Sequence, residues 1–215
     1  MDEASKTLSF YSTLLTPLLQ GKILDIGAGV DPISEGAVIF DKDQGDAQFL
    51  DRYFPSNSFD VVFSSHCLEH MMDPREALKT WYSLVRPGGF LIIIVPDEDL
   101  YEQGHFPSIF NSDHKATFTI SKSNSWSPRS YNILELCNLL GGNIFYLAQQ
   151  SDNYDLAQKS HKYLGVLKFY FTRQLLRIEF FRRLSLYFRL LPIDQTSQSK
   201  STLAQVCFIV EKLSK

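Results

Sequence analysis

Short apolar runs alternate with amphipathic segments along this chain, a pattern that predicts an α/β fold. A strand that helices cover on both faces reads as a continuous run of Val, Ile, Leu and Phe, without regular polar positions. The most hydrophobic run predicts the central strand of the sheet. In chain order, the predicted strands cover residues 22–26, 37–40, 59–65, 90–95, 143–147 and 204–210, with 90–95 at the centre.

Helical spacing predicts three longer helices. Residues 3–20 carry leucines at helical spacing and are followed by a glycine, which is typical of a helix end. Asp73 and Pro74 begin a second helix that runs to residue 84. A third helix is predicted over residues 127–140, where two glycines stop it, and a short helical piece over residues 67–72.

The sequence also makes a prediction for each of three segments that connect these elements. Residues 41–58 are too few for a full helix and a further strand between the second and third predicted strands. We therefore expect the helix and the strand usually found at this place to be reduced or missing. Residues 86–89, Arg-Pro-Gly-Gly, predict a turn. Residues 96–126 form a long polar and aromatic loop region, and ordered loops of this length are usually functional. The last predicted strand can pair antiparallel with residues 143–147.

Composition indicates an ordinary globular protein whose charge is unevenly distributed. The 215 residues are 44% hydrophobic and 21% charged, with a net charge of −3, which disfavours a dedicated nucleic-acid binder. Residues 159–191 are basic, whereas the rest of the chain is acidic. The three cysteines have no metal-ligand spacing and predict free thiols in a reducing compartment. With no signal peptide or spanning apolar run, we expect a cytoplasmic protein.

The first chemical signal lies in residues 22–32, where a predicted strand runs directly into a glycine turn. Gly27 and Gly29 lack a Cβ, so the backbone can turn tightly and approach a ligand closely. Asp25 stands near the carboxyl end of this strand, where ligands bind in open α/β sheets. The third glycine of a dinucleotide-binding pattern is absent, and the interval to Asp41 is shorter than the roughly 20 residues of such folds. These departures disfavour a nicotinamide-dependent oxidoreductase.

Five ordered stretches resemble the class I S-adenosylmethionine-dependent methyltransferases, in particular the branch called methyltransferase type 11. The most specific are Ser-x-x-Leu-Glu-His, which ends at His70, and the Arg-Pro-Gly-Gly stretch. The resemblance covers about residues 20–149 and the final strand. It implies a Rossmann-like, doubly wound, mostly parallel sheet of six or seven strands, with the last strand antiparallel and a helical insertion before it. The five stretches are residues 24–29, Asp41, 45–47, 59–70 and 84–96.

The resemblance implies that S-adenosylmethionine is the cofactor and that the strand ends hold it. Asp25 would position the methionine end, Asp41 would accept hydrogen bonds from the ribose hydroxyls, and Asp46 would accept one from the adenine amine. Asp43 competes with Asp41 for the ribose because the interval is short. The cofactor-binding residues implied are Asp25, Gly27, Ala28, Gly29, Asp41, Lys42, Asp46, Ala47, Ser65 and His66.

The acceptor site is expected in the loops of residues 97–115, which concentrate acids, amides and two histidines. A histidine that titrates near neutral pH is a natural general base for a hydroxyl acceptor. We predict His114 as this base, with His105 second. The other interpretation is a solvated polar loop in which both histidines make only structural hydrogen bonds.

His66 and His70 flank Glu69 in the order His-x-x-Glu-His, which occurs as an inverted zinc-binding motif. A zinc site needs at least a third protein ligand, and the sequence shows none nearby. The methyltransferase pattern accounts for all three residues. We therefore expect no metal site, with Glu69 and His70 serving structure or lining the cofactor pocket.

The basic segment has three interpretations. Its bulky apolar side chains follow helical spacing over residues 180–191, with arginines elsewhere on the helix. Such a helix can cover the acceptor site or a sheet edge, form a dimer contact, or place residues 163–191 against a membrane surface or a lipid-linked substrate.

The sequence thus predicts a single domain of residues 1–215 that transfers a methyl group to a small-molecule acceptor, such as a sugar or glycan-like hydroxyl or amine. The alternative is a methyltransferase-like protein without catalysis, acting as a binding protein or membrane-peripheral scaffold. No nucleic-acid partner is expected, and the oligomeric state is left open. The expected parts are an N-terminal helix (1–21), a core (22–149 and 203–213) and a helical basic insertion (150–200).

Overall fold

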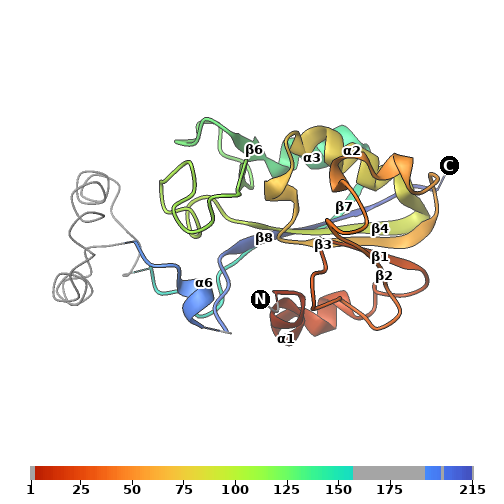
Figure 1. The fold of residues 1–215 in the computed structure, drawn as a ribbon, viewed down its shortest axis with the longest axis horizontal. Helices are drawn as coiled ribbons and strands as arrows, with labels where there is room; N and C mark the ends of the chain where they lie inside the picture. Colours follow the sequence, from red (N-terminus) through yellow and green to blue (C-terminus); the bar gives the residue numbers. More distant parts are fainter. Residues whose placement is uncertain (1–2, 157–191, 200, 215) are drawn as a thin grey trace.

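A six-stranded sheet forms the centre of the protein in a computed structural model that describes residues 3–156, 192–199 and 201–214 (Figure 1). The strand order is β2-β1-β3-β4-β8-β7. All pairs from β2 to β4 are parallel, whereas β8 is antiparallel to both of its neighbours. The prediction of a mostly parallel sheet with an antiparallel last strand is confirmed. The strands are β1 (Ile23–Ile26), β2 (Val38–Phe40), β3 (Phe59–Ser65), β4 (Val85–Pro96), β7 (Asn143–Gln150) and β8 (Gln205–Glu211).

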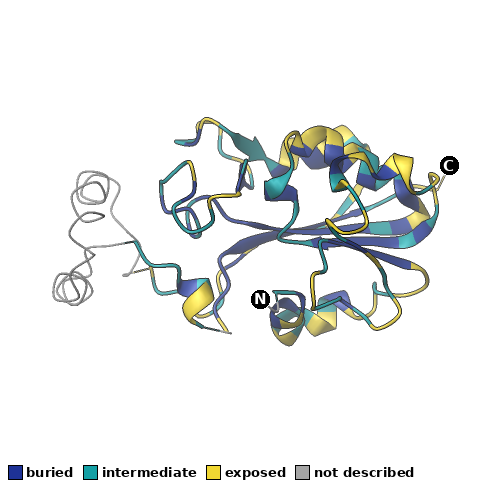
Figure 2. Ribbon diagram, viewed as in Figure 1, coloured by how far each residue is buried: buried dark blue, intermediate teal, exposed yellow. Residues whose placement is uncertain are grey.

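Helices cover both faces of this sheet. α2 (Pro74–Leu84) and α3 (Ile133–Leu140) lie on one face, and α1 (Glu3–Leu15) lies on the other (Figure 1). Because side chains alternate across a strand, the two faces carry separate apolar clusters. Leu91 faces the cluster under α2 and α3, whereas Ile92 faces the one under α1. The inner strands β1, β3 and β8 are almost entirely buried, whereas the edge strands β2 and β7 are partly exposed (Figure 2).

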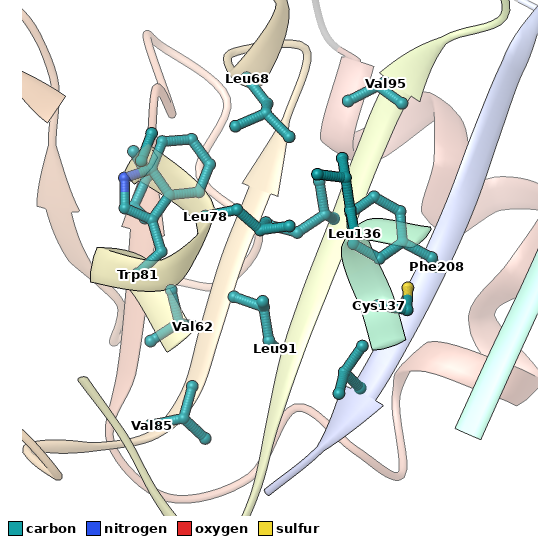
Figure 3. Packing of buried hydrophobic residues seen from close by; sticks show 14 of the residues in the cluster. Val62, Leu68, Leu78, Trp81, Val85, Leu91, Val95, Leu136, Cys137 and Phe208 are labelled. Carbon is teal, nitrogen blue, oxygen red and sulfur yellow. The ribbon is translucent and has the colours of Figure 1, made fainter. Parts of the chain in front are cut away.

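The face under α2 and α3 contains the larger cluster. Trp81 and Leu78 of α2 and Leu136 of α3 pack over Val62 and Leu91 of the sheet (Figure 3). All of these side chains are at most 2% exposed. Burial of this kind accounts for the continuous apolar runs of the inner strands, which are covered from both sides.

Helix α2 begins where the sequence predicted. The Asp73 side chain accepts hydrogen bonds from the backbone N–H groups of Arg75 and Glu76 at 3.0 and 3.2 Å, and Pro74 occupies the first turn. This carboxylate satisfies donors that would otherwise have no partner at the helix end. Helix α1 is shorter than the predicted 3–20 and carries a kink at Tyr11.

The predicted start of the third helix at residue 127 is wrong. Helix α3 begins at Ile133. The Asn132 side chain caps its start by accepting a hydrogen bond from the Glu135 N–H. The preceding residues form strand β6 (Ser130–Asn132), which pairs in parallel with β5 (Thr117–Thr119) in a second small sheet. Gly141 ends the helix in a left-handed conformation with φ of 70°, as the sequence predicted.

The turn predicted at residues 86–89 is also corrected, because these residues belong to strand β4. Phe59 pairs with Val85 and Val61 pairs with Phe90, so the residues between Val85 and Phe90 bulge out of the register. Gly88 adopts a φ of 77° at this irregularity. The glycines thus serve a bulge within a strand rather than a chain reversal.

The expected loss of elements after the second strand is confirmed. Residues 41–58, all of which the structure describes, hold no strand and only a 3-10 helix, η1 (Ala47–Arg52). Strand β2 is therefore the edge of the sheet. The short helical piece predicted over residues 67–72 is also present, as η2 (Leu68–His70).

Cys137 and Cys207 are buried free thiols, and burial raises the pKa of each to about 12. The third cysteine, Cys67, is half-buried and also free. The predicted free thiols are thus confirmed. They lie where a thiol behaves as a small apolar side chain.

Replacing Trp81 by phenylalanine should lower the free energy of unfolding by about 1–3 kcal/mol. The indole of Trp81 is fully buried, and its Nε1–H donates to the Ala47 carbonyl oxygen at 2.7 Å. Phenylalanine would leave this carbonyl without its donor and open a small cavity. Urea unfolding followed by circular dichroism measures the change.

Trp126→Phe is the matched control. Trp126 is half-buried, and its Nε1–H donates to a carboxylate of Asp99 at 3.1 Å. Because this site is less enclosed, its loss should cost less. An equal or larger cost at Trp126 would contradict the assignment of Trp81 to the centre of the core.

The interpretations of the basic segment, including the predicted surface over residues 163–191, fall outside the described residues. Among the residues that the structure describes, no helix is long and apolar enough to cross a membrane.

Candidate cofactor and acceptor site

Two cavities of about 550 and 350 Å³ lie at the carboxyl ends of β1, β2 and β3. Gly27, Asp41 and His66 directly follow these three strands. Gly27 and His66 border both cavities, so the two spaces adjoin at these residues. The first turn of α1 closes one side of the smaller cavity through Glu3 and Ala4. This is the position where ligands bind in open α/β sheets.

The backbone after β1 requires glycine at position 27. Gly27 has a φ of 77°, and a Cβ built there would lie 2.7 Å from the Cβ of Cys67. Gly29 has a φ of 56°, but a Cβ there would meet no atom within 4 Å. The Gly29 N–H donates to the Asp41 carboxylate at 2.8 Å, so the glycine turn is tied to the acid that follows β2. The sequence-predicted turn and acid are thus brought together.

Asp25 is a buried carboxyl group on the smaller cavity. It is 1% exposed, and its carboxylate accepts a hydrogen bond from the Ile33 N–H at 2.7 Å. Burial raises its pKa to about 7, and repulsion from Asp31 and Asp41 adds to the effect. A cationic ligand group in the cavity would favour the ionised form.

The larger cavity carries the groups that the resemblance placed around a nucleoside. Asp41, Lys42, Asp46 and Ala47 all border it, together with the rings of two phenylalanines, Phe40 and Phe49. One carboxylate oxygen of Asp46 caps η1 by accepting from the Gln48 N–H at 2.9 Å. Asp43, the competing ribose ligand, is exposed and lies outside the residues that border this cavity.

Ser65 and His66 end β3 between the two cavities. The Ser65 hydroxyl is buried, and no group that the structure describes forms a hydrogen bond with it. His66 has a φ of 54°, a strained conformation for a residue other than glycine. Its Nε2 lies 3.1 Å from the Gln205 side-chain oxygen. Burial works to lower the pKa of His66, but the carboxylates of Glu69 and Glu3 outweigh it and raise the value.

The two predicted acceptor-side histidines lie in different surroundings. His114 is buried, with its Nδ1 2.6 Å from a Glu102 carboxylate oxygen and its Nε2 3.9 Å from a Glu69 carboxylate oxygen. His105 is half-buried, and burial lowers its pKa while Glu102 opposes the change. Among the described residues, those that border the two cavities include neither histidine.

A cluster of histidines and acids that the sequence did not assemble joins His114 to the larger cavity. We define the histidine–glutamate cluster as Glu69, His70, Glu102, Asp113 and His114. His70 and Asp113 border the larger cavity, and the His70 and His114 rings pack edge to face with centroids 5.0 Å apart. The signal in the sequence was the His-x-x-Glu-His spacing, but its partners come from loops more than 30 residues away.

Comparisons with known proteins agree with this geometry. Residues 24–93 match the family model described as a methyltransferase domain. No protein with a curated function matches the chain.

Solved structures share the fold at low sequence identity. A protein from Bacillus halodurans C-125 described as a methyltransferase is 11% identical with a TM-score of 0.55, over 96% of this chain and 100% of that one. A Haloferax volcanii protein described as a methyltransferase, solved with the Trm112 methyltransferase activator, is 11% identical with a TM-score of 0.54, over 98% and 94% of the two chains. The YcgJ protein of Bacillus subtilis is 12% identical with a TM-score of 0.51, over 95% and 98%.

The domain match and the sheet topology together define the class of this protein. Residues 24–93 match a methyltransferase domain, and the sheet has the fold of solved proteins described as methyltransferases. The expectation drawn from the five ordered stretches is confirmed at this level.

Proposed function

We propose that this enzyme methylates a hydroxyl or amine group of a small, polar acceptor, such as a sugar or a glycan-like molecule. The observation that carries the proposal is the position of the histidine–glutamate cluster, which reaches the same cavity as the predicted nucleoside site. The acceptor side therefore carries imidazoles and carboxylates, which are the kinds of group that can accept the proton of a hydroxyl.

The residues around the glycine turn fit the cofactor. The buried Asp25 carboxyl suits the ammonium group of the methionine part, and the unpartnered Ser65 hydroxyl offers a further polar contact. Asp41 offers acceptors for a ribose diol. The bound cofactor supplies an electrophilic methyl group on a sulfonium, so the protein has to position the acceptor and take up a proton.

The acceptor would enter from the side of His70, Asp113 and Lys115, which border the larger cavity. The Lys115 ammonium donates to the His70 carbonyl oxygen at 2.8 Å, and the Lys115 N–H donates to the Glu69 carbonyl oxygen at 2.8 Å. These contacts fix the loop against η2. A fixed loop holds the acceptor at a defined angle to the methyl group.

His114 remains the first candidate for the proton-accepting group, acting from the inner side of the cluster. Replacing His114 by asparagine should lower turnover by about 100-fold or more while leaving cofactor binding nearly unchanged. Turnover with a panel of sugar and amine acceptors, measured by mass spectrometry with labelled cofactor, tests this. Binding of S-adenosylhomocysteine by calorimetry is the companion measurement.

His105→Asn is the comparison, because His105 lies outside the cluster. A large loss of turnover in this variant, with His114→Asn unaffected, would transfer the role to His105. Unchanged turnover in both variants would remove the two histidines from the chemistry. A panel in which no acceptor is methylated would favour the alternative of a binding protein without catalysis.

A further inference from the structure

Three side chains of the histidine–glutamate cluster direct ligand atoms toward one point. The Nε2 of His70 lies 4.0 Å from a Glu69 carboxylate oxygen, and the Nε2 of His114 lies 3.9 Å from the same oxygen. All three atoms lie within 4.8 Å of one another. Ligands of a tetrahedral zinc ion stand about 3.3–3.5 Å apart at bond lengths of about 2.0–2.2 Å. Side-chain movements of roughly an ångström or less would therefore close the site.

The other nitrogen of each histidine is held by a carboxylate. The Nδ1 of His114 lies 2.6 Å from Glu102, and the Nδ1 of His70 lies 3.1 Å from the Asp113 carboxylate and 3.3 Å from the Asp113 carbonyl oxygen. A histidine that binds a metal through Nε2 commonly donates its Nδ1–H to a carboxylate or carbonyl, which fixes the tautomer. Both rings are thus oriented with Nε2 toward Glu69.

Glu69 itself is a buried carboxylate with no hydrogen bond. It is 1% exposed, and within the described part of the chain neither of its oxygens has a hydrogen-bond partner. The nearest ring nitrogen, Nδ1 of His66, is 3.6 Å away. One oxygen of Glu102, also 1% exposed, likewise lacks a partner. Three imidazole nitrogens, of His66, His70 and His114, lie 3.6–4.0 Å from one Glu69 oxygen, which is too far for a hydrogen bond. A buried carboxylate held only by such long contacts is costly.

We propose that Glu69, His70 and His114 bind a divalent transition-metal ion beside the cofactor cavity. Two imidazoles and one carboxylate suit zinc, cobalt, iron or manganese rather than calcium or magnesium. Three protein ligands leave at least one coordination position open. His70 and the adjoining His66 border the cavity, so that position can face the acceptor.

In this arrangement, which rests on the proposed function, the ion holds the acceptor hydroxyl and lowers its pKa. The hydroxyl proton leaves to water, an oxygen electron pair forms the new bond to the methyl carbon, and the broken carbon–sulfur bond leaves its pair on sulfur. The sulfonium becomes a neutral thioether, so charge and atoms balance. With the ion bound, His114 is a metal ligand and water takes the proton, whereas in protein without the ion His114 keeps the proton-accepting role of the proposed function.

Metal binding to the full-length protein tests the site without an acceptor. After treatment with a chelator and buffer exchange, calorimetric titration with Zn²⁺ should show one tight site per chain. Titration with Co²⁺ should give the visible absorption of cobalt held by nitrogen ligands. Glu69→Gln and His114→Asn should abolish this stoichiometric binding. His70→Asn, at a half-exposed side chain, tests the same ligand set with less risk to folding.

Glu102→Gln separates a metal site from a merely structural network. Its carboxylate orients His114 without being one of the three proposed ligands, so metal affinity should fall by about 10–100-fold and remain measurable. His105→Asn, outside the cluster, should keep wild-type affinity. S-adenosylhomocysteine binding and thermal unfolding confirm that each variant is folded.

The outcomes separate this inference from the proposed function. Wild-type protein that binds S-adenosylhomocysteine but no metal, or metal binding that survives Glu69→Gln, His70→Asn and His114→Asn alike, would overturn the metal site and leave the methyltransferase proposal standing. One tight metal site in a protein that methylates no acceptor would support the metal site and count against the proposed function.

Discussion

Gly27→Ala should weaken S-adenosylhomocysteine binding by at least about 10-fold and lower the free energy of unfolding by about 2–4 kcal/mol. Two effects add at this position. The φ of 77° is unfavourable for any residue with a Cβ, and the new methyl group would lie 2.7 Å from the Cβ and 2.9 Å from the Sγ of Cys67. The backbone must shift, and it carries the N–H that donates to the Phe40 carbonyl oxygen. Calorimetry and urea unfolding measure the two losses.

Gly29→Ala is the matched control for Gly27. It imposes a similar backbone cost at a φ of 56°, but its Cβ meets no atom within 4 Å. The loss of stability should therefore be about 1–2 kcal/mol, from the backbone alone. Equal losses at both glycines would show that the contact with Cys67 does not constrain the turn.

Asp25→Asn should make the cofactor-free protein more stable above neutral pH, and it should weaken S-adenosylhomocysteine binding by about 10-fold or more. The carboxyl ionises with a pKa of about 7 in the folded protein and at its ordinary value of 3.8 when exposed. Between these values the folded chain keeps a proton that the unfolded chain has lost. Stability therefore falls as the pH rises through this window and levels off above about 7.

The amide introduced by Asp25→Asn cannot ionise, so the variant escapes this loss. The free energy of unfolding of the variant should exceed that of the wild type by an amount that grows from about pH 4 to about pH 7 and reaches about 1–4 kcal/mol. Urea unfolding across this pH range measures the difference. Binding weakens because the amide carries no charge to attract the ammonium group of the ligand. A variant that is less stable than the wild type at about pH 8 would contradict the burial cost assigned to Asp25.

Asp60→Asn is the control, because it should change the free energy of unfolding in the opposite direction to Asp25→Asn. The Lys22 N–H holds the pKa of Asp60 below its usual value; burial opposes this effect, and the Arg86 guanidinium adds to it. Ionised Asp60 therefore adds stability above the unfolded pKa, and this contribution disappears as the pH falls. Its replacement should lower stability at neutral pH, whereas Asp25→Asn should raise it.

The positions of the strands along the chain could be predicted from short apolar runs, because burial on both faces leaves a strong pattern. Residues 90–95 read as the central strand and form the middle of β4, with β3 on one side and β8 on the other. The start of α2 could also be predicted, because its capping residues Asp73 and Pro74 act within a single turn. These features depend on neighbours in the sequence or on simple burial.

Two elements could not be read locally because a partner strand determines them. Residues 86–89 carry turn residues, yet pairing with Phe59 and Val61 absorbs them as a bulge in β4. Residues 130–132 look like the start of a helix, but pairing with β5 draws them into a strand. In both segments, pairing with a neighbouring strand overrides the local conformational preference of the residues.

Some parts of the candidate site could likewise be predicted from the sequence, and others could not. The glycine turn and Asp41 were predictable because both directly follow apolar strands. The histidine–glutamate cluster was not, because His114 and Glu102 come from the loop after β4, whereas Glu69 and His70 come from η2. The sequence showed the His-x-x-Glu-His spacing but not the third histidine beside it, so a metal site was not expected. Only the fold places His114 next to Glu69.

The most direct test of the central claim is calorimetric titration of the full-length protein with S-adenosylhomocysteine, with NADH titrated in parallel. Class I methyltransferase identity predicts saturable binding of one S-adenosylhomocysteine per chain and no saturable binding of NADH. Saturable binding of NADH, with none of S-adenosylhomocysteine, would contradict it.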